Sequence, residues 1–342
     1  MRLLSVFISL GMSWAAWGQT YTISTFAGGA LPVNIAGTSA SLGYAPRYLA
    51  ADQAGNVFFV YQNSVLRLDA ATGVLTLVAG NGTTGFSGDN GPATTARLNG
   101  PAGIAVDSNG NLYIADTLNN RIRMVSGGVI STVAGAGVQG FSGDKGQATS
   151  ALLSSPTGVA VDSNGNLYIA DTLNRRVRQV ASTGVINTVA GGGTSLLENA
   201  SATKAQLANS FGIAVDSTGI LYIADTDNNR IRKVTGGVIA TVAGSGTQGF
   251  SGDNGPATSA KLALPTGIAL DSNGNLYIAD SDNNRIREVS NGVITTAAGG
   301  RSSLGDNGPA TSAQINSPTG VAIDSAGNLY IADFGDSWRR VA

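Results

Sequence analysis

The chain has 342 residues, of which 42% are apolar and 12% charged, and its formal net charge is -1. This apolar content excludes wholesale disorder, and the near-neutral charge argues against a nucleic-acid-binding protein, which would show a basic stripe. The chain has 48 glycines but no histidine and no cysteine, which excludes His-based acid–base catalysis, thiol nucleophiles, disulfides and metal sites ligated by His or Cys.

Residues 1–18 have the sequence pattern of a signal peptide. Met1 and Arg2 precede the apolar run LLSVFISLGMSWAAW, and Ala16-Trp17-Gly18 has the small-x-small pattern of a cleavage site before Gln19. A buried N-terminal helix is the alternative. No later stretch approaches ~20 consecutive apolar residues. We therefore expect a secreted or periplasmic protein with no membrane span after cleavage.

The rest of the chain is an internal repeat. The phrase GIAVDSNGNLYIADTLNNRIRMV begins at residue 103, near-copies begin at 158, 212 and 267, and weaker copies begin at 48 and 320. A fixed period of about 55 residues is typical of a solenoid or a propeller. In each repeat, GIAVD, NLYIAD, RIRMV and GVISTVAG read as four strands separated by turns. Four-stranded antiparallel units repeated radially make a β-propeller.

The two ends of the chain complement each other. The last repeat stops at Ala342 without its fourth strand, and YTISTFAGG near the N-terminus matches that missing element. We therefore predict an all-β, six-bladed β-propeller in which strand 21–28 completes the C-terminal blade and removes the free sheet edges. The predicted propeller spans 19–342 as one domain, with blade cores at about 48–80, 103–135, 158–191, 212–244, 267–299 and 320–342 plus 21–28.

The repeated phrase resembles the NHL repeat, and this resemblance covers almost the whole of 19–342. It implies a β-propeller but does not fix a chemistry. The family includes RNA-binding regulators, protein-interaction modules, a zinc-dependent amidating lyase and, more distantly, lactonases. The amidating lyase needs zinc-binding histidines, which this chain lacks.

Inserts that follow each fourth strand set this chain apart, and GFSGD recurs in three of them. The favoured interpretation is a structural staple, in which the phenylalanines cap a blade interface and the aspartates tie a turn. An oxygen-rich calcium loop is the alternative, although no insert has the ligand count of a D-x-D-x-D-G loop. We predict no cofactor otherwise, and no metal ligand is assigned. The insert residues are Phe86, Asp89, Phe141, Asp144, Phe250 and Asp253.

An aspartate and an arginine five residues apart flank the second-to-third connection of four repeats. We expect them to form one structural ion pair in each blade, because catalytic groups are normally few and unique. The predicted pairs are Asp116 with Arg121, Asp171 with Arg176, Asp225 with Arg230 and Asp280 with Arg285.

Positions that break the repeat are better candidates for function. The residue before the first glycine of each inner strand is expected to line a channel mouth, where a polar or anionic ligand would bind. A divergent insert adds Glu198 and Lys204. The alternatives without a binding role are that Phe211 fills the channel and that Glu198 is a solvated charge on a loop. The channel-mouth residues are Arg47, Ala102, Thr157, Phe211, Thr266 and Thr319.

These observations favour an exported, non-enzymatic scaffold whose loop-rich face binds a protein or a glycan. We expect a monomer that binds no nucleic acid. The alternative is a metal-dependent, lactonase-like hydrolase or lyase that acts in the central channel. RNA binding conflicts with the signal peptide, the net charge and the four lysines.

Overall fold

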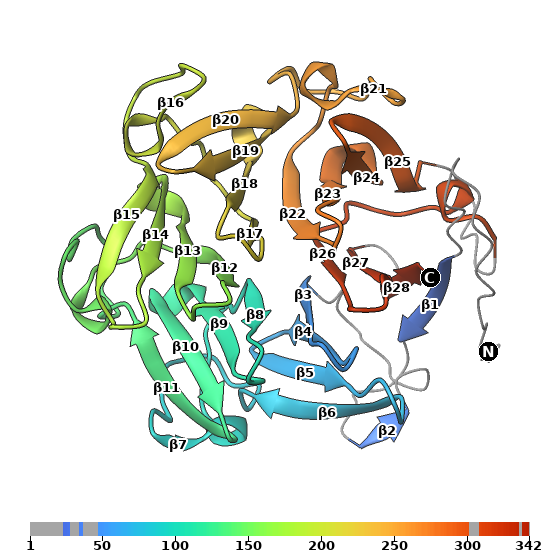
Figure 1. The fold of residues 1–342 in the computed structure, drawn as a ribbon. Helices are drawn as coiled ribbons and strands as arrows, with labels where there is room; N and C mark the ends of the chain where they lie inside the picture. Colours follow the sequence, from blue (N-terminus) through green and yellow to red (C-terminus); the bar gives the residue numbers. More distant parts are fainter. Residues whose placement is uncertain (1–22, 28–33, 37–46, 301–307, 335–336, 342) are drawn as a thin grey trace.

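A computed structural model describes residues 23–27, 34–36, 47–300, 308–334 and 337–341, and these form an antiparallel β structure arranged around a central axis (Figure 1). The predicted signal peptide lies outside the described residues. Within the described ranges the strands form six sheets. We number them 1 to 6 in chain order, so that sheet 1 holds β2–β6 and sheet 6 holds β26–β28 with β1.

Each sheet is built from four main strands. The innermost strands are β3 (Arg47–Ala51), β8 (Ile104–Val106), β12 (Pro156–Val161), β17 (Ile213–Val215), β22 (Pro265–Leu270) and β26 (Gly320–Ile323). The second strands are β4 (Val57–Tyr61), β9 (Leu112–Asp116), β13 (Leu167–Asp171), β18 (Leu221–Asp225), β23 (Leu276–Asp280) and β27 (Leu329–Asp333). The third strands are β5 (Ser64–Leu68), β10 (Arg121–Ser126), β14 (Arg176–Val180), β19 (Arg230–Thr235), β24 (Arg285–Ser290) and β28 (Ser337–Val341). The outermost strands are β6 (Val74–Ala79), β11 (Val129–Ala134), β15 (Ile186–Gly191), β20 (Val238–Ala243), β25 (Val293–Gly299) and β1 (Ile23–Ala27).

The two ends of the described chain meet in sheet 6. Strand β1 pairs antiparallel with β28, with Ile23 opposite Val341 and Ser24 opposite Arg340. Residues 23–27 of the predicted strand 21–28 therefore supply the outermost strand of the C-terminal sheet, and the prediction of an all-β propeller is confirmed.

Four sheets have a fifth strand that the four-stranded prediction missed. Each of these strands is only two residues long and pairs with the outermost strand of its sheet. Strand β7, for example, lies on β11 and contains Pro92, a residue without an amide donor that is tolerated at a sheet edge. The insert thus runs along the sheet into which it leads. The added strands are β2 (Ile35–Ala36), β7 (Gly91–Pro92), β16 (Ala200–Ser201) and β21 (Gly255–Pro256).

Single 3-10 turns complete the connections. One group lies within the inserts: η2 (Ala93–Thr95), η4 (Ala148–Ser150), η6 (Ala202–Lys204), η8 (Ala257–Ser259) and η10 (Ala310–Ser312). The other group joins second to third strands: η3 (Thr117–Asn119), η5 (Thr172–Asn174), η7 (Thr226–Asn228) and η9 (Ser281–Asn283). None of the helical segments in the described ranges has the length and apolar content that a membrane span requires.

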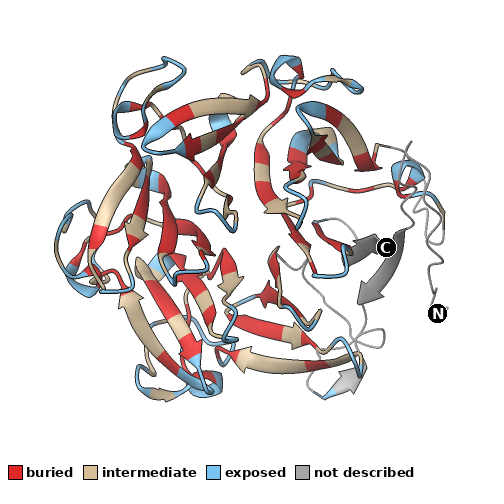
Figure 2. Cartoon of the chain, in the orientation of Figure 1, coloured by how far each residue is buried: buried red, intermediate tan, exposed pale blue. Residues whose placement is uncertain are grey.

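The core lies between the sheets, where buried residues alternate with exposed connections (Figure 2). Six clusters of buried side chains occur in the described part of the chain, and each combines residues of two neighbouring sheets. One cluster joins sheet 6 to sheet 1 through Tyr330 and Phe59. The innermost strands also contact one another around the axis, with β26 against β3. Apolar burial between sheets therefore continues around the whole ring.

In sheets 2 to 6 a glycine at the start of the inner strand is required by this close approach, whereas sheet 1 has Tyr48 at this position. Gly103 donates its N–H to the Thr157 carbonyl oxygen of the next sheet at 2.6 Å. A Cβ atom on Gly103 would overlap that same carbonyl group, and Gly158 and Gly212 stand in the same relation to Phe211 and Thr266. At Gly103, Gly158 and Gly212 the carbonyl group of the next sheet therefore leaves no room for a side chain.

Candidate functional site

The inserts and the second-to-third connections lie together on one face, which we call the insert face. The Asn119 side-chain amide on η3 donates to the carbonyl of Gly85 in the preceding insert, at 2.8 Å. Asn174 and Asn283 make the corresponding bonds to Gly140 and Gly249. Because these contacts repeat, the loops of neighbouring connections are fixed against one another.

An arginine in the third strand holds the insert to its sheet in sheets 2 to 5. The Arg123 guanidinium is fully buried and lies 2.7 Å from the Asp89 carboxylate of the insert. On its other side it lies 3.3 Å from Asp116 at the end of β9. The Thr132 hydroxyl on β11 also donates to Asp89. Asp89 is thereby tied to β10 and β11 directly and to β9 through Arg123, by charge-assisted bonds.

The predicted partner of Asp116 is therefore wrong. Asp116 pairs with Arg123, seven residues away, and no salt bridge joins it to Arg121 among the described residues. The Arg121 guanidinium instead lies over the Phe86 ring, 3.8 Å from its centroid, and donates to the carbonyl of Ala136. Arg121 stays partly exposed while its guanidinium stacks on the Phe86 ring.

The same correction holds in sheets 3, 4 and 5. Arg178, Arg232 and Arg287 take the place predicted for Arg176, Arg230 and Arg285 as partners of the buried aspartates. Arg178 and Arg287 also bind the insert residues Asp144 and Asp253 at 2.6 Å. Phe141 and Phe250 stack on Arg176 and Arg285.

The buried aspartates occupy a costly environment. Burial raises the pKa of the Asp116 carboxyl above its ordinary value, and hydrogen bonds from Asn119 and Asn99 together with Arg123 oppose that rise. The corresponding carboxyls of Asp171, Asp225 and Asp280 are raised for the same reason. Four buried ion networks of this kind fix the geometry of the connections.

Sheet 1 replaces this network with apolar residues. Tyr61 occupies the position of Asp116, and Leu66 occupies that of Arg123; both side chains are buried in one cluster. A buried ion pair and a packed apolar pair of similar volume are energetically comparable. The repeat therefore tolerates both solutions in this fold.

Glu198 is a member of this structural set. Its carboxylate lies 3.3 Å from the Arg232 guanidinium and accepts hydrogen bonds from the amide and the hydroxyl of Thr241. The same atoms of Arg123 and Thr132 hold Asp89, so Glu198 stands in for that aspartate in sheet 4. Lys204 ends η6, and its carbonyl oxygen accepts the N–H of Ser195.

The hydroxyl groups of the channel-mouth residues Thr157 and Thr266 form hydrogen bonds to the next sheet. The Thr157 hydroxyl lies 2.6 Å from the Thr172 hydroxyl and also reaches the Phe211 carbonyl of the next sheet. The Thr266 hydroxyl bonds to Ser281 and to the carbonyl of Thr319. The Arg47 side chain lies outside the described residues. A binding role for these residues remains a prediction.

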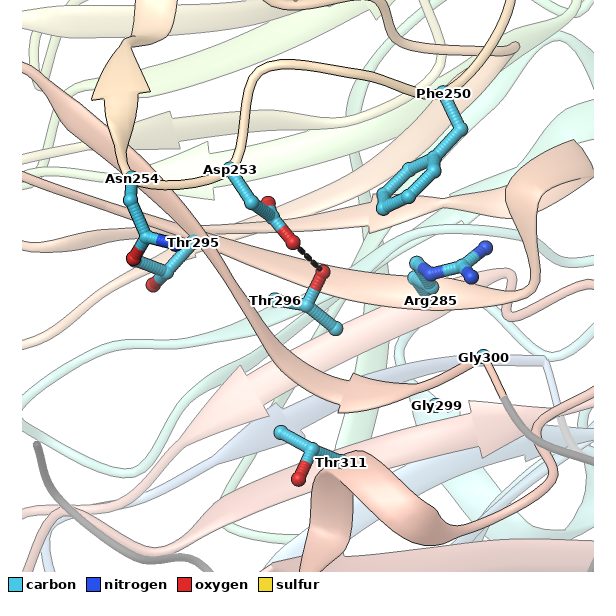
Figure 3. Close-up of a pocket in the computed structure, with 9 residues that line it drawn as sticks. All are labelled: Phe250, Asp253, Asn254, Arg285, Thr295, Thr296, Gly299, Gly300 and Thr311. Atoms are coloured by element: carbon cyan, nitrogen blue, oxygen red, sulfur yellow. Dashed lines mark hydrogen bonds between the residues drawn. The ribbon is translucent and has the colours of Figure 1, made fainter.

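A hollow lies beside the ion network of sheet 5 and is lined by none of the channel-mouth residues. A cavity of about 430 Å³ is bounded by Phe250, Arg285, Asp253 and Thr296, and the last two are hydrogen-bonded (Figure 3). The described residues contain no group of three His, Cys, Asp or Glu side chains that could hold a metal ion.

Several large exposed apolar side chains lie on the insert face, a feature that the repeat pattern alone did not single out. Leu118 is 60% and Leu173 is 55% exposed, and both lie on connections between second and third strands. The inserts add Val138, Leu196 and Leu197. The exposed leucine could have been found in the sequence, because the second residue of this turn is leucine in TLNN at 117–120 but aspartate in TDNN at 226–229.

Comparison with known proteins identifies the repeats. Residues 82–142 and 136–199 match the family described as Teneurin NHL domain, and residues 212–234 and 262–288 match the family described as NHL repeat. Teneurin-1 of Mus musculus is 37% identical over 230 residues, which are 59% of this chain and 8% of that protein. The chain therefore spans less than a tenth of the length of this teneurin.

Solved structures show the same fold at low sequence identity. An auxiliary nutrient binding protein from Bacteroides ovatus has a TM-score of 0.66 and 18% identity, covering 94% of this chain and 76% of that one. A gluconolactonase from Xanthomonas campestris has a TM-score of 0.57 and 15% identity, covering 95% and 98%. The matched repeats and the observed propeller together show that the chain belongs to the NHL-repeat β-propeller family.

Proposed function

We propose that this chain is an exported binding module, a six-bladed propeller whose insert face recognises a protein or a glycan. Each of the six sheets would be one blade of a closed ring, and residues 1–18 would be removed on export to a secreted or periplasmic location. The mature protein would act as a monomer. A solved relative of the same fold is called an auxiliary nutrient binding protein, which supports a binding role.

The exposed apolar side chains on the turns and inserts of the insert face carry this proposal. Apolar groups exposed on one face of a protein are typical of interaction surfaces. Leu118 and Leu173 lie on turns that are anchored to the inserts through the neighbouring Asn119 and Asn174. The face therefore presents apolar groups from a rigid frame, which limits the entropy lost on binding.

The test is a screen of the purified chain against an array of secreted protein domains and an array of glycans. The comparison variant is L118N/L173N, which replaces both exposed leucines by a polar residue. The matched control is V129N/V238N, since these valines are also exposed but lie on the opposite hairpins. Ligands lost only in L118N/L173N support the proposal, and an absence of ligands on both arrays overturns it.

The lactonase-like alternative draws support from the fold of the Xanthomonas campestris gluconolactonase. A lactone-hydrolysis assay with added divalent ions, together with metal analysis of the purified chain, tests it. A stoichiometric ion that activates hydrolysis would replace the binding-module proposal. Calcium is included among these ions because the inserts are rich in Asp and Asn oxygens.

A ligand at the channel mouth is a further part of the proposal. Arg47→Ala or Phe211→Ala would weaken the binding of an anionic or polar ligand there while the fold is retained. Unchanged affinity in both variants would exclude this site.

A further inference from the structure

One position of the insert face changes its chemistry halfway around the ring. It lies two residues beyond the end of the second strand, in the turn to the third. Sheets 2 and 3 carry Leu118 and Leu173 there, whereas sheets 4 and 5 carry Asp227 and Asp282. All four side chains are exposed. At this position the face is thus apolar over sheets 2 and 3 and acidic over sheets 4 and 5, while the insert that leads into sheet 4 also exposes Leu196 and Leu197.

The backbone does not require this change. The turn of sheet 2 begins with Asp116 at φ -83°, ψ 71° and ends with Asn120 at φ 52°, ψ 43°. The turn of sheet 4 begins with Asp225 at φ -84°, ψ 71° and ends with Asn229 at φ 52°, ψ 42°. Because leucine and aspartate occupy the same conformation, the turn itself selects neither residue.

The two aspartates are charges without a cationic partner. Asp227 accepts a hydrogen bond from the Asn209 amide at 2.6 Å, and Asp282 accepts one from Gln248 at 3.3 Å. Within the described ranges neither carboxylate forms a salt bridge, whereas the buried aspartates of the same sheets each have an arginine. Their negative charge is therefore available to a basic ligand.

The apolar half extends beyond the two leucines. Val138 is 62% exposed and lies in the insert that leads into sheet 3, next to Gln139. The Gln139 amide bonds to the Ser154 hydroxyl, and the Ser154 carbonyl accepts the N–H of Leu173, so this insert and this turn are joined. In the corresponding inserts, threonine replaces Val138 at residues 83 and 247.

We propose that the insert face binds a polypeptide segment that carries apolar side chains at one end and basic side chains at the other. The apolar end would lie over Leu118, Val138 and Leu173, and the basic end over Asp227 and Asp282. A polypeptide combines aliphatic side chains with cationic ones, whereas a neutral glycan carries no cationic group. This inference rests on the proposed function and specifies its ligand.

Fluorescence anisotropy with synthetic peptides of about 12 residues, about 40 Å long when extended, tests it. One peptide has three leucines in one half and three lysines in the other, and a second has the halves exchanged. Two controls replace the lysines by glutamate or the leucines by serine. The expected result is that a Leu–Lys peptide binds at least about tenfold more tightly than both controls, a difference of ~1.4 kcal/mol, and that salt weakens its binding.

Variants of the full chain show which part of the insert face binds the leucines of the peptide and which part binds its lysines. L118N/L173N is expected to lose the leucine contribution and D227N/D282N the lysine contribution and the salt dependence, whereas V129N/V238N retains both. Equal binding of the Leu–Lys and the glutamate peptides, or equal binding by wild type and D227N/D282N, overturns the inference. If the arrays return glycans that depend on Leu118 and Leu173, the polypeptide inference fails while the binding-module proposal stands.

Discussion

Arg123 on β10 and Asp89 in the preceding insert lie 2.7 Å apart although 34 residues separate them in the chain. The same spacing joins Arg178 to Asp144 and Arg287 to Asp253. Each insert is therefore positioned by a residue of the sheet that it precedes, and the insert face has the rigidity of the sheets.

Removal of the buried guanidinium should be strongly destabilising. Arg123→Met leaves Asp116 buried without its cation, and breaking such a pair costs about 3–5 kcal/mol. Urea denaturation of the full chain measures the free energy of unfolding. Arg121→Met is the matched control, because Arg121 is partly exposed and stacks on Phe86, and its loss should cost ~1 kcal/mol or less.

A second substitution distinguishes lost charge balance from lost packing. D116N/R123M removes the uncompensated charge but keeps an acceptor for the Asn99 N–H, which Asp116 binds at 2.8 Å. The double variant should therefore be more stable than R123M alone. If D116N adds its own destabilisation to that of R123M, the two residues do not act as a pair.

Gly103→Ala should disturb the contact between sheets 2 and 3. The new methyl group would overlap the Thr157 carbonyl, and overpacking of this kind costs about 1–3 kcal/mol. Gly91→Ala is the control, because its Cβ would meet only the Gly88 carbonyl oxygen at 3.3 Å. Equal urea midpoints for the two variants would contradict the role assigned to the inner-strand glycine.

Glu198→Ala should behave like Asp89→Ala. Both carboxylates bind a buried arginine and a threonine hydroxyl, but each is partly exposed, so solvent screening limits the loss to ~1 kcal/mol. Urea denaturation compares the two variants. A destabilised D89A beside an unchanged E198A would return Glu198 to the candidates for ligand binding.

Tyr113 provides a prediction for alkaline pH. Burial, followed by the charge of Asp107, raises the pKa of the Tyr113 phenol to about 12. A tyrosine in the unfolded chain ionises near pH 10, so the folded state keeps a proton that the unfolded state loses. This contribution to stability is present below about pH 10 and is lost as the pH rises through about 12.

Phenolate absorbance during a pH titration measures this ionisation, and the difference between wild type and Y113F isolates Tyr113. D107N should lower the pKa of Tyr113 by removing the charge while keeping the acceptor of the hydrogen bond from its hydroxyl. If the Tyr113 titration in the wild type has its midpoint near pH 10, burial and Asp107 do not raise the pKa of this phenol.

The propeller class and the pairing of the chain ends could be predicted from the sequence because both depend on the period of the repeat. The partner of Asp116 could not. Arg121 and Arg123 lie on the same face of one strand, so the spacing in the sequence is compatible with either arginine as the partner of Asp116. Phe86, which comes from an insert outside the repeated strands, occupies the space above the sheet and stacks on Arg121.

The role of Glu198 was missed for a similar reason. It is one of two glutamates in the chain, and rarity alone suggested a special function. Counting 34 residues forward to Arg232 would have placed it with Asp89 and Asp144, because the distance from the insert to the third strand is constant. The channel-mouth threonines were placed near the axis, but their hydrogen bonds to the next sheet depend on close packing that the sequence does not specify.

The pairing of β1 with β28 has a consequence for biosynthesis. Strand β1 leaves the ribosome roughly 310 residues before β28, and at about 5–20 residues per second this delay lasts ~15–60 s. During that time β1 has no partner strand in the nascent chain, and its amide and carbonyl groups are open to other edges. Ring closure is therefore the last step of assembly, and a chaperone that covers this segment would protect the molecule when it is most prone to aggregate.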